Sequence, residues 1–577
     1  MNNLILLPAN VWIEDLNKNY LILTDNSLNS IYENSINLPY HWNDRKKLYK
    51  DHLFILELYE TYLKKVSVTL NLKHDMNMSN EYWRLIVGPW LYYFIAIVVD
   101  RYEMVRIASK EFDIKHAQIP KYIQDEWVPI DYIDFNEKFY TDEWNYYIFS
   151  EIIKKTKLVA IEESKDHLIP VSFRKTGKRT SLIKLILFFL TRLTRRIRRR
   201  ILFVEMDIPQ KNLYKLLYRL KSISFSYYLR VRPNFHKIDH HKRENFLGKS
   251  KKDDALKVIL DVLIPENIPT SYLEGFNEIK DMASKIFPRQ VDLVLTSNAY
   301  FSNELFKFWV ANQKLKGTKL WVMVHGGHHG TALFNGPGEL TEEIADRFYS
   351  WGWGKYNLPS PKLSKLRKFK IKTNKDNILF IPYSVSIYSN HIDSSPIASS
   401  FNDCLKMHCN FFEKLQKLNL DHRLMIRIKE DKTLTNIEKV YSEYISTEYI
   451  YSHKESLLES ISKSGLTIVT YDSTVFLESL TLNHPTCLFI RKEFWEMSKD
   501  SQPYFDQLVE CGIVHYDEIT LTNHILKFQD NYSGWWNKEE VQIAIKSFLH
   551  RFGLSNDHWD EDWYNEIDLY LKNIGKS

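Results

Sequence analysis

The chain has 577 residues, of which 44% are hydrophobic and 26% are charged. These proportions are typical of a folded protein and exclude a disordered one, and the low counts of 17 glycines and 18 prolines exclude collagen-like and linker-like sequences. At roughly 100–200 residues per domain, the length predicts two to four domains. The formal net charge of +6 indicates, taken alone, a mildly basic protein.

The positive charge is concentrated in one basic segment, residues 174–200, which holds eleven Lys and Arg and no Asp or Glu. The rest of the chain has 67 basic and 72 acidic residues, so any electrostatic partner is expected at this segment. Drawn as a helix, residues 181–201 place apolar side chains mostly on one side and arginines on much of the other, which favours an amphipathic insertion on an anionic membrane surface. Nucleic acid is the competing partner, but the segment lacks interleaved aromatic residues, so no nucleic acid is expected.

The cysteines and the apolar runs bear on the compartment. The four cysteines are Cys404, Cys409, Cys487 and Cys511. They are too few for a disulfide framework and no two pairs share zinc-finger spacing, so we expect buried free thiols and no metal site. The N-terminus lacks the features of a signal peptide, and the apolar runs at 91–99 and 185–190 are shorter than the ~20 residues of a membrane span. A cytoplasmic protein is expected, peripheral on the inner face of the cytoplasmic membrane.

The elements of the first part of the chain follow from its apolar runs. The first 170 residues are predicted to be mostly helical, with strands at 4–7 and 20–24. After the basic segment, the sequence predicts a strand at 201–206, a helix at 254–264, a strand at 291–297, a helix at 303–316 and a buried strand at 319–324.

From about residue 376, strands and helices alternate regularly. Strands are predicted at 378–384, 424–429, 466–471 and 485–490, with helices at 399–417 and 454–463, another starting near 473, and a last helix at 565–574. Short apolar runs that alternate with helices predict βαβ units around a parallel sheet. We therefore expect an α/β fold with two Rossmann-like domains, at 1–365 and 366–577, the N-terminal half being enriched in helix.

The densest motif is VHGGHHG at residues 324–330, directly after a predicted buried strand. Ligands of open α/β sheets bind beyond the carboxyl ends of strands, and Gly326 and Gly327 allow a tight turn and a close backbone approach. The histidines of the motif are His325, His328 and His329. Imidazoles titrate near neutrality, and His325, the nearest to the strand end, is the first choice for a catalytic base, with His329 as a second catalytic candidate. A metal site and a turn with exposed histidines are the alternatives.

The second motif is TYDSTVFLES at residues 470–479, where a predicted strand is followed by a helix. Ser473 or Thr474 caps this helix, and helix N-termini bind phosphates through free N–H groups and the positive end of the dipole. Asp472 is grouped with these two residues, and Glu478, one turn into the helix, could accept hydrogen bonds from ribose hydroxyls. An ordinary helix cap is the structural alternative.

Two further sets of charged residues are weaker candidates. Arg427 and Lys429 share one face of the strand at 424–429 and could meet a diphosphate or a carboxylate, although a solvated charge cluster would look the same. In the N-terminal half, charged residues occur among probable core tryptophans: Asp44, Arg45, Arg84, Asp100 and Arg101. They are expected to form structural ion pairs or an acceptor-side cleft, with Asp100 as a third catalytic candidate. P-loop and GxGxxG motifs are absent, which speaks against ATP-kinase and dinucleotide functions.

Six motifs occur in one order along almost the whole chain: HWNDRKK, YWRLIVGPWL, VMVHGGHHG, FYSWGWG, VTYDSTVFLESLTLNHPT and PYFDQLVECGIVH. In this respect the chain resembles a family of transferases encoded in bacterial surface-carbohydrate clusters (O-antigen, capsule). That family usually shows a Gln-His-Gly-Gly motif, and here Val324 stands where Gln is common. More distantly, the chain is similar to GT-B transferases that use CMP-sugars or CDP-glycerol, but it has no His-Pro motif at 427–430.

The resemblance implies a GT-B-like fold with two Rossmann-like domains facing a cleft. It implies a glycosyltransferase that moves a sugar, such as a nonulosonic acid, from a nucleotide-sugar donor, CMP-linked being favoured, to a glycan or lipid-linked glycan acceptor. The donor would bind the C-terminal domain, the acceptor the N-terminal domain, and no cofactor is implied. The first alternative is a CDP-glycerol-type glycerophosphotransferase. An alternative of another class is a non-enzymatic membrane- or nucleic-acid-binding protein that acts through the basic segment.

Overall fold

The computed structural model describes residues 4–7, 19–23, 35–171, 199–222, 237–248, 250–251, 254–371, 376–390, 392–429, 431, 434–452 and 455–574. The amphipathic insertion expected at 174–200 lies outside these residues, except for Arg199 and Arg200, which begin a strand. The chain forms two compact units. Unit 1 comprises Met1–Glu205, Ser224–Leu320 and Ile387–Ile392, and unit 2 comprises Met206–Ile223, Trp321–Ser386 and Asp393–Ser577.

The two units interleave along the sequence. Residues 321–386 belong to unit 2, and the short segment 387–392 belongs to unit 1. The units are therefore not two consecutive stretches of chain. The acceptor and donor roles expected for 1–365 and 366–577 stay predictions.

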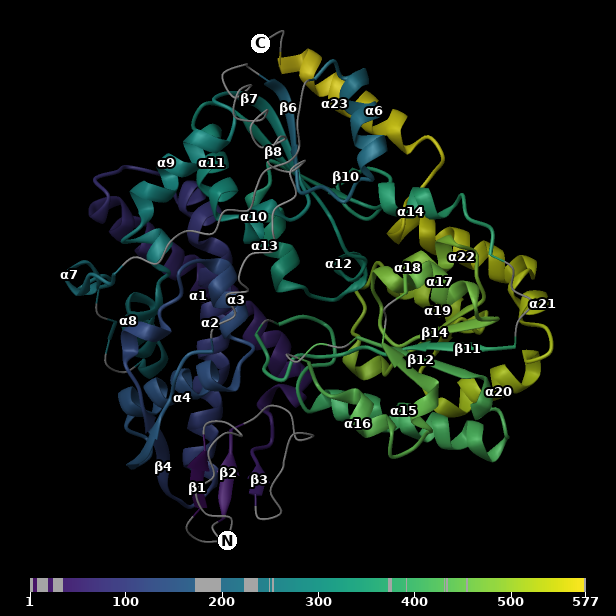
Figure 1. The fold of residues 1–577 in the computed structure, drawn as a ribbon, viewed down its shortest axis with the longest axis horizontal. Helices are drawn as coiled ribbons and strands as arrows, with labels where there is room; N and C mark the ends of the chain where they lie inside the picture. Colours follow the sequence, from purple (N-terminus) through teal and green to yellow (C-terminus); the bar gives the residue numbers. More distant parts are fainter. Residues whose placement is uncertain are drawn as a thin grey trace. The chain divides into compact units, whose positions relative to one another are not determined.

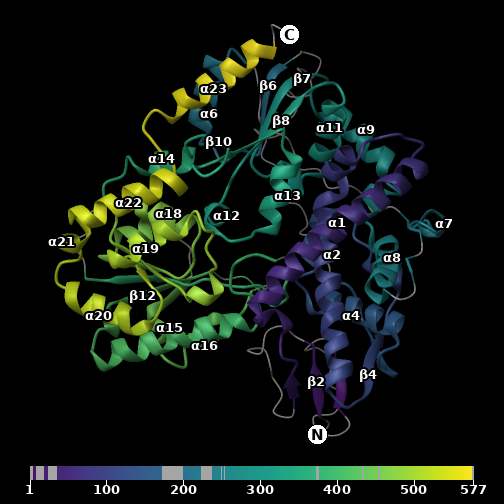
Figure 2. The ribbon, with the colours of Figure 1, turned by 180° about the vertical axis from the view of Figure 1, so that it is seen from behind.

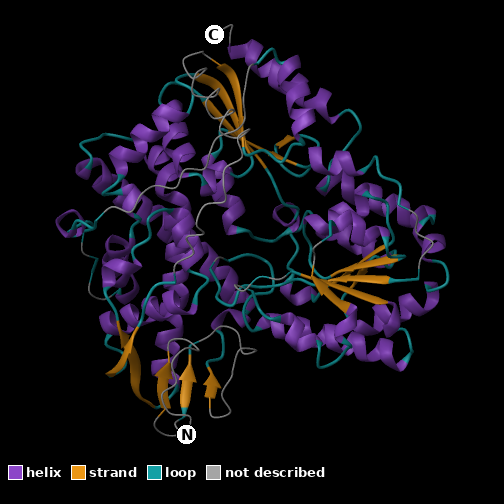
Figure 3. Ribbon diagram, viewed as in Figure 1, coloured by secondary structure: helices purple, strands orange, loops and turns teal. Residues whose placement is uncertain are grey.

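Unit 1 contains a parallel sheet of five short strands, with the order β3-β2-β1-β4-β5. The strands are β1 (Leu4–Leu7), β2 (Tyr20–Ile22), β3 (Ser35–Asn37), β4 (Ile114–Lys121) and β5 (Ile161–His167), near the N-terminus in Figure 3. The predicted strands at 4–7 and 20–24 are confirmed. Strand β5 was not predicted, because its sequence IEESKDH contains no apolar run. A second pair of parallel strands, β6 (Arg199–Val204) and β7 (Val291–Thr296), confirms two further predictions.

Long helices make up most of unit 1. They are α1 (Arg45–Lys73), α2 (Asn80–Glu111), α4 (Asp142–Thr156), α8 (Ala255–Asn267), α9 (Phe276–Ile286) and α11 (Glu304–Lys314). The central one is α2, which begins at the cap Ser79 and is buried at every residue from Leu85 to Arg101. It contacts α1, α4, α8 and α11. The predicted helical character of this half is confirmed.

Among the described residues, α2 is the one helix long and apolar enough to cross a membrane. Of its most apolar window, 94% is buried inside the protein. This burial is what a core helix shows, because a helix that is apolar all round must be covered on every side.

Unit 2 is built on a parallel sheet of six strands with the order β13-β12-β11-β14-β15-β16. The strands are β11 (Ile378–Ile381), β12 (Leu424–Ile428), β13 (Ile450–Ser452), β14 (Leu466–Val469), β15 (Thr486–Phe489) and β16 (Val514–His515). The chain winds outward from β11 to β13, then returns to the middle and winds the other way from β14 to β16. This is the doubly wound order of a Rossmann-like sheet, and it confirms the predicted α/β class.

Helices cover both faces of this sheet (Figures 1 and 2). One face carries α15 (Ser400–Lys417), α16 (Ile437–Tyr441) and α20 (Glu518–Phe528), and the other carries α17 (Leu457–Ser462), α18 (Thr474–Thr481), α19 (Gln502–Glu510) and α22 (Glu539–Phe552). The alternation of side chains along β11 serves both layers. Leu379 and Ile381 pack with Ile461 of α17, whereas the Phe380 ring contacts Phe411 and Phe412 of α15.

The remaining elements of unit 2 come from three parts of the chain. They are α6 (Gln210–Arg219), β8 (Lys319–Met323, from Trp321), α12 (His328–Thr331), α13 (Gly336–Ile344), β9 (Arg347–Ser350), β10 (Tyr356–Asn357), α14 (Pro361–Leu366), α21 (Tyr532–Trp536) and α23 (Trp559–Ile574). Strands β8, β9 and β10 pair in parallel. The last predicted helix is α23, which contacts α6 and α14.

Candidate functional site

The site of unit 2 forms where the winding of its sheet reverses, between β11 and β14. The two strands are held together past their ends, because the Tyr383 N–H donates to Thr470 Oγ1 at 2.7 Å and the Thr470 N–H donates to Ile381 O at 3.1 Å. Doubly wound sheets bind ligands in the crevice beyond the carboxyl ends of the strands at this reversal. The chain that leaves β14 here carries Asp472 and Ser473 of the second sequence motif.

Helix α18 begins directly at this point, with Ser473 as its N-cap. Ser473 has an extended backbone, with φ −158°, and its side chain accepts none of the first N–H groups of the helix. The N–H groups of a first helical turn have no partners inside the helix, and the helix dipole adds partial positive charge there. Ser473 and Thr474 are partly exposed. The helix start therefore offers N–H groups and two hydroxyls to an anion.

The glycine-rich motif at 324–330 packs against this helix start. A Cβ atom on Gly327 would lie 2.6 Å from Leu477 Cδ1 and 3.4 Å from the carbonyl carbon of Ser473, so a larger residue would force the Leu477 side chain to move. A Cβ on Gly326 would lie 3.8 Å from Thr474 Oγ1, an ordinary contact. The fold thus brings the two strongest sequence motifs, about 145 residues apart in the printed sequence, to one place in unit 2.

His328, the first residue of α12, occupies the inner part of this site. Its side chain is 14% exposed, and neither ring nitrogen has a hydrogen-bond partner among the described residues. The nearest charged atom is Asp472 Oδ2, 3.9 Å from His328 Nδ1, and the ring contacts Trp495 edge-on at 5.1 Å. Buried polar groups are normally hydrogen-bonded, so an imidazole without such bonds is available to a ligand.

Carboxylates around His328 set its charge. Burial alone would lower the pKa of His328, but the neighbouring carboxylates of Asp472, Asp393 and Glu496 outweigh it, and the pKa is raised. Asp472 itself is buried and accepts a hydrogen bond of 2.5 Å from Thr331 Oγ1. Of the three histidines in the motif, His328 therefore has the surroundings best suited to binding a ligand. The sequence motif gave no reason to choose it over His325.

The other two histidines of the motif have different surroundings. His325 is exposed to water at the end of β8, yet desolvation by the surrounding chain lowers its pKa, with Asp207 opposing and His329 reinforcing that effect. His329 is 16% exposed, and its Nε2 lies 3.1 Å from Glu342 Oε1. The His329 ring also packs against Phe348 at 5.3 Å. His329 is therefore held by the protein, whereas His325 faces solvent.

The remaining donor-side candidates have partners of their own in unit 2. Glu478 is buried on α18 and pairs with Lys362 Nζ at 2.5 Å. Arg427 lies on β12 and donates through Nη2 to the carbonyl of Glu455 at 3.0 Å. Lys429 is 60% exposed and lies 3.4 Å from Asp431. Of the predicted donor set, the glycines, Asp472, Ser473 and Thr474 share one place, and their roles stay predictions.

In unit 1, Asp100 and Arg101 form a fully buried network on α2. One carboxylate oxygen of Asp100 is 2.8 Å from His41 Nε2 and the other accepts from Arg101 Nη1. Arg101 also donates to Asn145 Oδ1 at 3.0 Å and to the Ser389 carbonyl at 3.0 Å. Burial, aided by the charge of Lys47, lowers the pKa of His41 to about 3, so this imidazole is neutral. Both oxygens of Asp100 have partners, as in a structural ion pair, while His41 Nδ1 has no hydrogen-bond partner among the described residues. The catalytic role expected for Asp100 stays a prediction.

The other acceptor-side candidates also have local structural partners. Asp44 is the N-cap of α1 and accepts from the N–H groups of Lys46 and Lys47 at 2.9 and 3.1 Å. Arg45 is the first residue of that helix and is partly exposed. Arg84 makes a bidentate pair with Glu60, at 2.5 and 2.8 Å, that joins α2 to α1. A role of these residues toward an acceptor stays a prediction.

Comparisons with known proteins give a family, and they show a distant similarity to solved structures. Residues 12–567 match the model of a family described as LIC12162 family transferase. The crystal structure of Acinetobacter baumannii MurG is similar with a TM-score of 0.30 and 11% sequence identity, over 64% of this chain and 98% of that chain. Such a low TM-score is too weak a similarity to transfer any property. No curated protein sequence matches the chain.

Proposed function

We propose a glycosyltransferase function for this chain, starting from the premise that it belongs to the LIC12162 family of transferases. The family match spans nearly the whole chain and residues of both units. One observation carries the proposal about the donor: the glycine-rich turn at 324–330 lies against the uncapped start of α18, at the reversal point of a doubly wound sheet. A nucleotide sugar, with its anionic phosphate, is the donor that this arrangement suits best.

The phosphate of the donor would bind at the start of α18. The N–H groups of the first turn and the hydroxyls of Ser473 and Thr474 would donate to its oxygens. Gly327 lets the turn pack directly on the helix, and Gly326, where a Cβ would meet only Thr474 Oγ1 at 3.8 Å, leaves the backbone beside the helix start open to a phosphate. In keeping with the resemblance to enzymes that use CMP-sugars, we favour a CMP-linked sugar such as a nonulosonic acid.

His328 and His325, whose pKa values are shifted in opposite directions, suggest two separate roles in the transfer reaction. The pKa of His328 is raised by its carboxylate neighbours, so its imidazole carries positive charge at higher pH than usual. That charge and the helix start would stabilise the negative charge that develops on the leaving phosphate. The pKa of His325 is lowered by desolvation, so its imidazole is neutral and can accept a proton from the attacking acceptor hydroxyl. Paired groups whose pKa values are pushed apart are typical of acid and base roles.

The acceptor would be a glycan or a lipid-linked glycan of a surface polysaccharide, held near an anionic membrane by the basic segment. This part of the proposal depends on the family resemblance and on the charge pattern of residues 174–200. A glycerophosphotransferase that uses CDP-glycerol would employ the same phosphate-binding helix start. The mass of the product separates the two, because one adds a sugar and the other a glycerol phosphate.

Nucleotide binding tests the proposal on the full chain. We expect one of CMP, CDP, UDP or GDP to raise the melting temperature, since a ligand at 100 times its Kd stabilises the folded state by about 2.7 kcal/mol. Ser473→Ala should remove this shift. The matched control is Ser456→Ala, because Ser456 is the N-cap of α17 in the same unit and does make its capping bonds. If no nucleotide shifts the melting temperature of the folded wild type, donor binding as proposed is wrong.

A further inference from the structure

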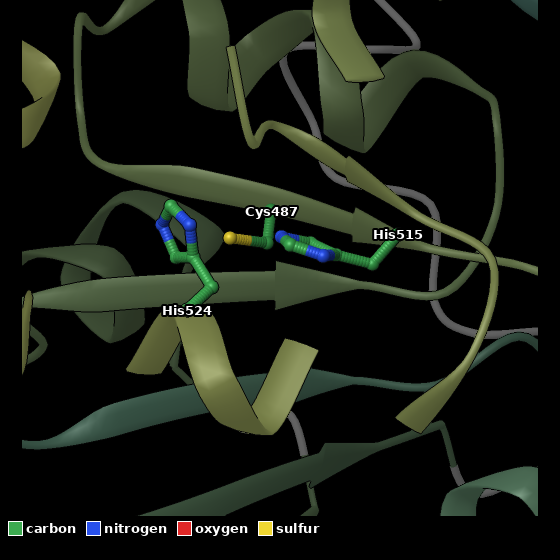
Figure 4. Close-up of side chains that lie close together, drawn as sticks. All are labelled: Cys487, His515 and His524. Carbon is green, nitrogen blue, oxygen red and sulfur yellow. The ribbon is translucent and has the colours of Figure 1, made fainter. Parts of the chain in front are cut away.

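A second cluster of ligand-type side chains lies in unit 2, on elements that the proposed donor site does not use. Cys487 comes from β15, His515 from β16 and His524 from α20 (Figure 4). One possible ligand atom from each residue lies within 4.8 Å of those of the other two. Figure 4 shows the Cys487 sulfur directed toward the His524 ring, with the His515 ring on its other side. Among the described residues, this is the one group of three such side chains that lies close enough to share a metal ion.

The sheet itself assembles the cluster. Strands β15 and β16 pair in parallel with Phe489 opposite His515, so Cys487 lies earlier on the neighbouring strand. Helix α20, which begins after its cap Asp517, brings His524 back over the two strands. The sequence spacing matches no zinc-finger motif, and for that reason the sequence predicted free thiols. All four cysteines are indeed free thiols.

The three side chains are buried, with exposures of 0% for Cys487, 6% for His515 and 9% for His524. His524 Nε2 has no hydrogen-bond partner among the described residues, and the ring packs at 4.3 Å from the Trp535 ring. Among the described residues, the hydrogen-bond partner of the Cys487 thiol is the Gly512 carbonyl oxygen, at 3.8 Å. Buried polar atoms are normally hydrogen-bonded, so nearly buried histidines and a thiol with so few hydrogen bonds are unusual in a protein interior.

The backbone carbonyl of Gly512 lies close to two of these side chains. Its carbonyl oxygen is 3.0 Å from His515 Nε2 and 3.8 Å from Cys487 Sγ. Gly512 has φ +73°, and a Cβ there would lie 2.8 Å from the His524 ring, so only glycine lets the main chain pass this close. A carbonyl oxygen thus lies beside two of the three possible ligand atoms, one on His515 and one on Cys487.

This set of atoms has the chemistry of a zinc site. Zinc prefers four ligands in a tetrahedron, with Cys sulfur at ~2.3 Å and His nitrogen at ~2.0–2.1 Å. Two ligand atoms of such a tetrahedron are about 3.3–3.8 Å apart, so the three side chains would close by about 1 Å.

We propose that Cys487, His515 and His524 bind one zinc ion, with the Gly512 carbonyl oxygen in reach of the fourth position. On binding, the sulfur–zinc bond replaces the S–H bond, and the thiol proton passes to solvent. The ion would tie α20 and the two-residue strand β16 to β15. Its role is structural, and the proposal stands apart from the nucleotide proposal, because none of the three residues lies at the start of α18.

Metal binding by the full-length protein tests this proposal. We expect about one zinc per chain by elemental analysis, and a chelator to lower the melting temperature. Cobalt(II) added to the chelated protein should give a thiolate-to-cobalt absorption band that saturates at one equivalent. Cys487→Ser should remove this band, and His524→Phe should weaken binding at least tenfold. Cys404→Ser is the matched control, because Cys404 is another buried free thiol of unit 2 and should keep the band and the stoichiometry.

The result that would overturn the proposal needs no variant. If the folded wild type neither gains a thiolate–cobalt band nor melts at a higher temperature with zinc, the three side chains form an ordinary buried cluster. Zinc content that persists in folded Cys487→Ser at the wild-type level would equally contradict it, since the ion would then bind elsewhere. A protein that binds zinc but no nucleotide would support this site and contradict the donor proposal.

Discussion

Each unit contains a histidine next to a buried aspartate, and the two pairs differ in what surrounds them. In unit 1, Asp100 bonds His41 at 2.8 Å and Arg101 with its second oxygen, and the pKa of His41 is lowered to about 3. In unit 2, Asp472 lies 3.9 Å from His328, and the pKa of His328 is raised. Both carboxylate oxygens of Asp100 have protein partners, and His41 lacks a partner only at Nδ1, while His328 has a hydrogen-bond partner at neither ring nitrogen among the described residues.

The contrast separates a structural pair from a pair suited to chemistry. A buried ion pair whose partners are all in place fixes helices relative to one another and offers nothing to a ligand. A buried imidazole with a shifted pKa and free ring nitrogens is the kind of group that binding and catalytic sites contain. The same two residue types therefore predict different behaviour, and each difference can be measured.

The largest effect is expected from Arg101→Ala. This change leaves the buried carboxylate of Asp100 without its cation and should cost about 3–5 kcal/mol in the free energy of unfolding. Urea unfolding of the full chain measures it. Arg84→Ala is the matched control, because Arg84 pairs with Glu60, which is half exposed, and should cost at most about 1 kcal/mol. Equal losses for the two variants would remove the structural role of the Asp100 network.

The second effect concerns activity. His328→Asn should lower the transfer rate about 100-fold, because a positioned acid or cation contributes at least that much to such reactions. His408→Asn provides the comparison, since His408 is a buried histidine of the same unit that bonds Tyr441 at 2.7 Å. It should lower stability and leave the rate of the folded fraction unchanged. A His328→Asn enzyme with the wild-type rate would take His328 out of the reaction.

A smaller effect tests how tightly the glycine-rich turn packs on α18. Gly327→Ala places a Cβ 2.6 Å from Leu477 Cδ1 and should cost about 1–3 kcal/mol of stability, as overpacked cores do. Gly326→Ala meets only an ordinary contact at 3.8 Å and should cost less than half as much. Thermal unfolding of the two variants measures both losses of stability. A larger loss for Gly326→Ala than for Gly327→Ala would contradict the close approach of the turn to the helix.

The smallest effect concerns pH: the contributions of His328 and His41 to the free energy of unfolding should change with pH in opposite directions. The raised pKa of His328 stabilises the fold below the ordinary histidine pKa of 6.5, and this contribution is lost as pH rises through the folded-state value. The lowered pKa of His41 acts in the opposite direction, with stability present above 6.5 and lost as pH falls toward 3. Urea unfolding of His328→Asn and His41→Asn from pH 5 to 9, each compared with wild type, should show opposite slopes. Slopes of the same sign would mean that the two pairs do not differ in charge.

Local sequence patterns predicted the second unit better than the first. Buried parallel strands such as β11 and β14 are continuous apolar runs, so they can be recognised without knowledge of the fold. Strand β5, with the sequence IEESKDH, forms because β4 offers an edge to pair with, and that information is not local. The interleaving of the units is likewise a long-range property that no linker composition reveals.

The candidate site was predictable in its motifs and not in its inner partners. Glycines after a strand and Ser-Thr before a helix are local signals, and the fold brought them together. The choice of His328 over His325 depends on Asp472 and Asp393, which reach it only in the folded chain. The same holds for Cys487, His515 and His524, whose spacing follows from strand order instead of a motif.

Helix α6 shows what interleaving means for a ribosome-bound chain. Its Lys215 pairs with Asp560 of α23 at 2.8 Å, across a sequence separation of 345 residues, and the Arg219 guanidinium lies 4.6 Å from the Tyr564 ring. At about 5–20 residues per second, α6 waits roughly 20–70 s for this partner during synthesis. Until then the apolar face of α6 is exposed and can aggregate. Unit 2 cannot finish folding before α23 has been synthesised. Its completion is timed by translation.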